Sequence, residues 1–83
     1  MYESQPDVFF NIVVDNVKKE RKKRNISQLK LAELLGFSSP NYIAKIETRK
    51  HNVSYNLYHL CKIANAFEME VVEFLPNDIL KNY

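Results

Sequence analysis

The chain of 83 residues is poor in glycine, cysteine and tryptophan, and each shortage narrows its class. It contains one glycine, one cysteine, three prolines and no tryptophan. The single cysteine, Cys61, excludes an internal disulfide and fits a reducing compartment, so we expect a cytoplasmic protein. No apolar run approaches the roughly 18 residues that a membrane span needs, and the first residues lack the basic start of a secretory signal. We therefore expect no membrane partner.

Residues suited to catalysis or metal binding are also scarce. His51 and His59 lie eight residues apart without a second cysteine or another ligand cluster, so we expect no metal site. The single glycine excludes a glycine-rich loop that cradles phosphate groups. No serine lies in the context of a nucleophile, and Glu68, Glu70 and Glu73 are interpreted as solvated acids. The sequence predicts a protein that is not an enzyme, needs no cofactor and has no evident small-molecule ligand.

Apolar residues, by contrast, are sufficient for one core. They make up 46% of the chain, and a chain of this length is expected to form one domain over residues 1–83. We expect its core at about 7–75 and a short C-terminal tail at 76–83. A domain this small buries only about 60% of its unfolded surface, so a second copy would help to cover apolar area.

Charge is distributed unevenly along the chain, although the formal net charge is only +2. Residues 18–50 contain ten lysines and arginines against three glutamates, and the remainder contains two lysines against seven acids. A basic segment beside an acidic remainder suggests a face that binds a polyanion. A solvated basic helix end is the alternative interpretation, and charge alone does not decide between the two.

Apolar residues recur at helical spacing and no alternating strand pattern occurs, so the sequence predicts an all-α fold of five helices. The predicted helices span about 7–24, 28–35, 40–48, 55–67 and 71–75. Their predicted N-caps include Asp7, Ser27, Ser39 and Ser54, and Pro40 is expected at the first position of the third helix. The predicted buried faces comprise Phe9, Phe10, Val13, Val14, Val17, Leu31, Ala32, Leu34, Leu35, Ile43, Ile46, Leu57, Leu60, Cys61, Ala64 and Phe67.

Residues 28–47 have the sequence pattern of a helix-turn-helix. Ala32 is a small residue where the two helices would cross, and Gly36 lies in the turn between them. Ile43 and Ile46 provide apolar anchors on the second of these helices. The remaining positions on that helix are then available to contact DNA.

These residues resemble the lambda-repressor-like, or xenobiotic-response-element-type, helix-turn-helix family. The resemblance rests on the segments 24–37, 42–47 and 60–67 and covers about residues 13–75. Segments 41–43 and 51–54 are similar to restriction–modification controller proteins. The chain departs from the family pattern by one additional residue in the turn near Phe37 and Ser38. It also has Arg49 where the family usually has glycine after the recognition helix.

The resemblance implies a DNA-binding site on the third predicted helix. The implied base-contacting residues are Pro40, Asn41, Tyr42 and Lys45. Asparagine pairs with adenine and lysine donates to guanine, whereas proline can only pack, for instance on a thymine methyl group. Phosphate contacts are implied for Gln28, Ser39, Arg49, Lys50 and Asn52. Arg21 matches a family position that pairs with Glu47 and holds the first helix to the third. Ordinary exposure or packing of these side chains is the alternative interpretation.

Together these features predict a sequence-specific, double-stranded-DNA-binding transcriptional regulator of bacterial type, either a restriction–modification controller or a phage-type repressor. We expect a homodimer on a palindromic operator. Its predicted dimer surface comprises Val71, Val72, Phe74, Leu75, Ile79 and Leu80; alternatively, these residues cap the core of the monomer. Two rival hypotheses are an antitoxin-like protein-binding module with secondary DNA binding, and a helix-turn-helix that binds DNA by charge alone.

Overall fold

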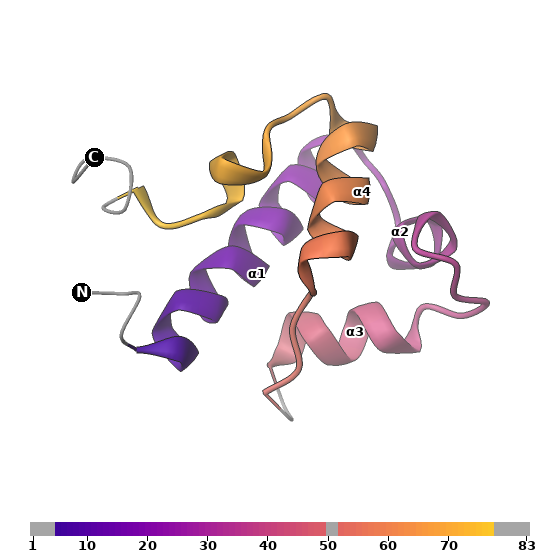
Figure 1. Ribbon diagram of the computed structural model, residues 1–83. Coiled ribbons are helices and arrows are strands. Elements are labelled where there is room, and N and C mark those ends of the chain that lie inside the picture. Colours follow the sequence, from indigo (N-terminus) through magenta and orange to yellow (C-terminus); the bar gives the residue numbers. More distant parts are fainter. Residues whose placement is uncertain (1–4, 50–51, 78–83) are drawn as a thin grey trace.

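The computed structural model describes residues 5–49 and 52–77. It contains the α-helices α1 (Pro6–Lys23), α2 (Gln28–Leu34), α3 (Asn41–Thr48) and α4 (Leu57–Phe67), followed by the 3₁₀ turn η2 (Val71–Phe74) (Figure 1). No strand occurs within the described residues, so the all-α prediction is confirmed. The predicted fifth helix is not: that segment is a single 3₁₀ turn. Extended residues flank it on both sides and Pro76 follows, which leaves no room for α-helical hydrogen bonds.

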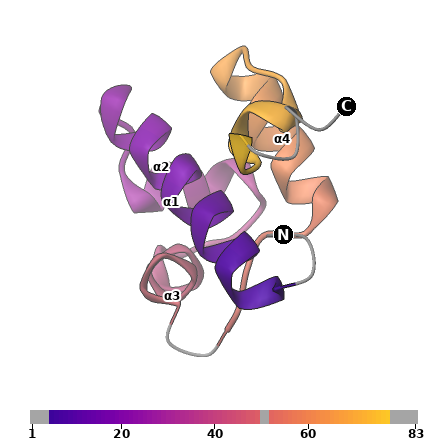
Figure 2. The same cartoon turned by 90° about the vertical axis from the view of Figure 1, so that its left-hand side faces the viewer.

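The elements pack in pairs, and α1 is the longest of the described helices. α1 contacts α3 and η2, α2 contacts α3 and α4, and η2 also contacts α4 (Figure 1). Figure 2 views α3 nearly along its axis, with α1 passing beside it. Among the helices of the described part, none is long and apolar enough to cross a bilayer.

A single apolar core receives side chains from every element. Its buried members are Val13, Val14, Val17, Leu31, Ala32, Leu35, Ile43, Ile46, Tyr55, Leu60, Ile63, Ala64, Phe67 and Phe74. Phe9, Phe10 and Leu34, predicted to be buried, are only partly so. Two predictions are wrong, because Leu57 is 74% exposed and Cys61 is exposed as well. The buried stripe of α4 includes Ile63 instead, so both residues lie on the outer side of that helix.

The predicted caps agree with the structure at α2 and differ at α1, α3 and α4. The Ser27 hydroxyl accepts a hydrogen bond from the Lys30 backbone N–H at 3.0 Å, as a serine N-cap does. Asp7 is not a cap, because α1 already begins at Pro6 and Asp7 lies in its first turn. A carboxylate there still interacts favourably with the positive end of the helix dipole.

The start of α4 lies two residues later than predicted. Ser54 is not its cap; Asn56 is, with its side-chain oxygen accepting from the His59 backbone N–H at 2.7 Å. Tyr55, between them, is only 3% exposed and belongs to the core. Burial of the Tyr55 ring in the core thus fixes the extended segment before α4, and the helix begins two residues later at Leu57.

The turn between α2 and α3 depends on its glycine. Gly36 has a φ of 90°, a value that residues with a Cβ atom rarely adopt. The Phe37 backbone N–H then bonds back to the Ala32 carbonyl at 2.9 Å, which closes the C-terminal end of α2. This reversal directs the chain into α3 and fixes the helix-turn-helix geometry.

Candidate nucleic-acid interface

The helix α3 has one buried and one exposed side. Ile43 and Ile46 are fully buried and anchor the helix to the core. Asn41, Lys45 and Thr48 are exposed, and their spacing of four and three residues places them on one side of the helix. A helix of eight residues is about 12 Å long, and the major groove of DNA admits an α-helix. The exposed side of α3 therefore has the size and the polar groups for a major-groove contact.

The N-terminal end of α3 lies at Pro40. Pro40 is the N-cap, one residue later than the predicted cap Ser39, and its carbonyl accepts the first helical hydrogen bond from Ala44 at 2.9 Å. The Ser39 hydroxyl still accepts from the Asn41 backbone N–H at 3.3 Å. Ser39 and Pro40 are both half-buried at this end, which leaves Asn41 as the first fully exposed side chain of the helix.

Tyr42 is packed at the first turn of α3. Its ring lies 4.5 Å from that of Phe37 and 6.2 Å from that of His59, measured between ring centroids. Burial among these rings, and secondarily the charge of Lys62, lower the pKa of His59. The aromatic cluster joins the α2–α3 turn, α3 and α4, so the tyrosine ring fastens the helix in addition to any contact it makes with DNA.

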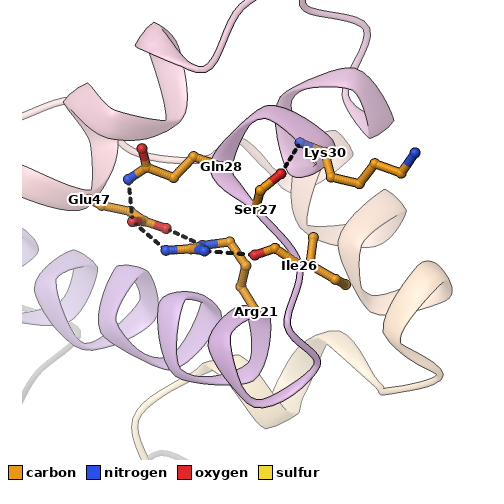
Figure 3. A network of polar contacts seen from close by, with 6 residues as sticks. All are labelled: Arg21, Ile26, Ser27, Gln28, Lys30 and Glu47. Atoms are coloured by element: carbon orange, nitrogen blue, oxygen red, sulfur yellow. Dashed lines mark hydrogen bonds and ion pairs between the residues drawn. The ribbon is translucent and has the colours of Figure 1, made fainter.

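A buried polar network fastens the last turn of α3 (Figure 3). Arg21 of α1 donates from Nε to Glu47 Oε2 at 2.8 Å and from Nη2 to Glu47 Oε1 at 3.0 Å. Its Nη1 donates to the Ile26 carbonyl at 2.7 Å, and Gln28 Nε2 donates to Glu47 Oε1 at 2.9 Å. The side chains of Arg21 and Glu47 are 8% and 3% exposed. One carboxylate of α3 is thereby bound to both α1 and the N-terminal end of α2.

The comparison with protein families agrees with this architecture. The model of a helix-turn-helix family, the lambda-repressor-like one, matches residues 17–74, which is more than half of the chain. The chain belongs to this family. No curated protein and no solved structure matches the chain significantly. Members of the family are DNA-binding regulators of transcription, and this chain is a DNA-binding regulator.

Arg49, which replaces the family's usual glycine, adopts the left-handed backbone conformation that glycine accommodates most easily. It is the C-cap of α3 and has a left-handed φ of 56°. Its guanidinium donates to Asn11 Oδ1 of α1 at 2.8 Å and to the Val53 carbonyl. The side chain implied to contact phosphate is thus engaged within the protein, where it ties the loop after α3 to α1.

Two other residues with an implied phosphate contact, Gln28 and Asn52, differ in their surroundings. Gln28 lies at the N-terminal end of α2, half-buried, with its amide nitrogen bonded to Glu47. Asn52 is exposed and, like Arg49, has a positive φ, of 55°. Lys50 lies outside the described residues. Of Gln28 and Asn52, Gln28 is the one whose side chain bonds to α3.

Two residues on the exposed side of α3 were not singled out from the sequence. Ala44 is half-buried and Thr48 is exposed, at three and seven residues after Asn41. Alanine and threonine contact thymine methyl groups in the major groove. The helical spacing from Asn41 was the signal that places them on the same side of the helix as Lys45.

The predicted dimer residues do not form one exposed surface. Phe74 is 0% exposed and belongs to the core of the monomer, so its assignment to a dimer surface is wrong. Its backbone carbonyl accepts from Asn16 Nδ2 at 2.9 Å, which holds η2 against α1. Val71 and Leu75 are half-buried and Val72 is 45% exposed. Ile79 and Leu80 lie outside the described residues.

Proposed function

We propose that the chain is a sequence-specific transcriptional regulator that places α3 in the major groove of double-stranded DNA. The observation that carries the proposal is the exposure of Asn41 and Lys45 on a short helix whose opposite side is anchored in the core. Asparagine makes a bidentate contact with adenine, and lysine donates to guanine O6 and N7. These two side chains supply most of the base discrimination. Pro40 packs on base edges, and Tyr42 makes a further base contact while its ring stays packed on the protein.

Phosphate contacts orient the helix in the groove. The N-terminal end of α2 presents backbone N–H groups, which suit an anion at a helix N-terminus. The amide nitrogen of Gln28 donates one hydrogen to Glu47 and keeps its second for a phosphate. Ser39, at the N-terminal end of α3, and Asn52, after its C-terminal end, extend this contact. Lys50, which lies outside the described residues, is proposed as a further phosphate contact. Arg49 contributes mainly by fixing the loop, because its guanidinium already bonds Asn11 and Val53.

The protein acts as a homodimer on a palindromic operator, as a controller or a phage-type repressor. One eight-residue helix contacts few base pairs, and two-fold pairing is the usual way to lengthen the site. Recognition helices in such a dimer lie about 34 Å apart. With Phe74 in the core, Val71, Val72 and Leu75 remain as the described part of the proposed dimer surface. Ile79 and Leu80, which the proposal also includes, lie outside the described residues.

Selection of bound duplexes from a random DNA pool tests the proposal directly. We expect an enriched palindrome whose half-site centres are about one helical turn apart. Asn41→Ala and Lys45→Ala should each reduce discrimination at one base position by about 1–3 kcal/mol. Asn65→Ala, which removes an exposed amide from α4 instead of α3, is the matched control and should keep the wild-type base preferences. If both main variants keep the wild-type base preferences, the assignment of base-contacting residues is wrong.

Sedimentation equilibrium tests the dimer and its surface. We expect a dimer at micromolar concentration and a monomer for Val72→Glu, because a charge on a buried apolar contact opposes association. Leu57→Glu is the matched control, since Leu57 is an exposed apolar residue on α4. If Leu57→Glu dissociates the dimer and Val72→Glu does not, the interface lies on α4.

A further inference from the structure

Four charged side chains of α1 line a shallow depression at the protein surface. They are Asp15, Lys18, Lys19 and Lys22. Lys18 is half-buried and the other three are exposed. The depression therefore combines three positive charges and one negative charge on a surface that water and ligands can reach.

Two neighbouring glutamates do not offset this charge, because each is already paired. Glu20 Oε1 lies 2.6 Å from Arg24 Nη1, and Glu47 Oε2 lies 2.8 Å from Arg21 Nε. Asp15 is the acid that lines the depression itself. The lining thus keeps a positive surplus, and an anion is the ligand that matches it.

Two contacts fix which side of α1 faces α3. Asn11 accepts a hydrogen bond from Arg49 at the C-cap of α3, and Arg21 bonds the last turn of α3. Lys18 follows Asn11 by seven residues and precedes Arg21 by three, so helical periodicity places it on the same side of α1, between these contacts. Lys22 is four residues further on and lies one turn along the same side of α1. Lys18 and Lys22 together form a ridge, and the ridge runs beside the C-terminal half of α3.

We infer that Lys18 and Lys22 form a second phosphate-binding site, which contacts the DNA backbone flanking the bases that face the C-terminal end of α3. The inference rests on the proposed function, because it needs α3 to lie in the major groove. A lysine ammonium binds phosphate as a point charge, and a phosphate contact positions the protein without recognising sequence. The site adds affinity and fixes orientation, while base discrimination stays with α3. Asp15 weakens it by repelling the same phosphates.

The salt dependence of DNA binding measures this contact. In fluorescence anisotropy with the selected palindromic duplex, the slope of log K against log salt should fall in magnitude by about 3.6 in Lys18→Ala/Lys22→Ala, since each phosphate contributes about 0.9 and the bound dimer loses two contacts in each subunit. Affinity near 100 mM salt should weaken at least about tenfold, and by the same factor for a scrambled duplex. Asp15→Asn should have the opposite effect, with tighter binding and a steeper slope.

Lys23→Ala is the matched control, because it removes the same charge one residue further along α1. Lys23 is exposed and points about 100° away from Lys22 around the helix axis. We expect Lys22→Ala to reduce the slope of the dimer complex by about 1.8, one contact of about 0.9 in each subunit, and Lys23→Ala to leave it nearly unchanged. Equal slopes in these two variants would overturn the inference, because the effect would then be one of net charge only. Circular dichroism checks that each variant remains folded.

Uncharged methylphosphonate substitutions, placed one at a time in the duplex, locate the contact. The wild-type protein should lose affinity at one or two phosphates flanking each half-site, and Lys18→Ala/Lys22→Ala should lose none there. If the substitutions affect both proteins equally, the ridge does not contact the backbone. If the wild-type protein binds no duplex with preference, the proposed function fails. Sequence-specific binding with equal Lys22→Ala and Lys23→Ala slopes refutes only the second phosphate site.

Discussion

Removal of the Arg21 guanidinium is expected to destabilise the fold severely. The Arg21 and Glu47 side chains are 8% and 3% exposed, so Arg21→Met leaves a buried carboxylate with only Gln28 bonded to it. The Ile26 carbonyl loses its donor as well. Breaking a buried ion pair by removing one partner costs about 3–5 kcal/mol. The whole unfolding free energy of a chain of 83 residues is about 4–12 kcal/mol, so this variant should lose a large part of it.

A double-mutant cycle separates the ion pair from the packing of the arginine stem. Because replacement of both charges by apolar groups leaves no buried charge unpaired, Arg21→Met/Glu47→Leu should be more stable than either single variant. Urea unfolding at pH 7 should give a coupling energy of about 2 kcal/mol or more. The half-buried i,i+4 pair of Glu20 and Arg24, at 24% and 30% side-chain exposure more solvated than the Arg21–Glu47 pair, is the control, with an expected coupling of about 0.3–0.5 kcal/mol. Additive effects in the Arg21–Glu47 cycle, within about 0.5 kcal/mol, would refute the reasoning.

Three further perturbations have defined outcomes. The lowered pKa of His59 means that the folded protein binds fewer protons than the unfolded chain, so stability should fall from pH 7 to pH 5. In thermal melts His59→Phe should flatten this slope, and an unchanged slope would contradict the assignment. Arg49→Gly should be about 1 kcal/mol more stable than Arg49→Ala in urea, because φ is 56° there; equal values would contradict this. Tyr55→Phe should change the unfolding free energy by less than about 0.5 kcal/mol, because its buried hydroxyl has no hydrogen-bond partner within the described residues; a larger loss would reveal an interaction of that group.

Local sequence patterns predicted which segments form helices better than they predicted where each helix starts and which of its sides is buried. Ser27 lies directly before a periodic segment, and it caps α2 as expected. Before α4, Ser54 and Asn56 are both suitable caps, and only burial of Tyr55 in the core decides for Asn56. The buried stripe of α4 was ambiguous for a similar reason. Stripes through Leu57 or through Ile63 share most of their members, and the neighbouring elements determine which one is buried.

Contacts between distant residues were predicted only where the family resemblance supplied them. Arg21 and Glu47 are 26 residues apart, and no local pattern connects them. The bond from Arg49 to Asn11 spans 38 residues and was not anticipated. Phe74 was ambiguous in another way, since an apolar residue in a short terminal segment can cover the core or meet a partner. The structure decides this by packing η2 against α1.

The contacts of α3 hold both of its ends to the rest of the protein. At the first turn Tyr42 packs on the turn and on α4, and at the last turn Glu47 is bound by Arg21. Arg49 then accepts a left-handed conformation, a cost of about 1–2 kcal/mol that its two hydrogen bonds offset. A helix of only two turns is not stable alone, so these attachments rather than propensity determine its position. Exchanges on its exposed side should therefore alter base contacts without moving the helix, which makes base preference separable from backbone affinity in this protein.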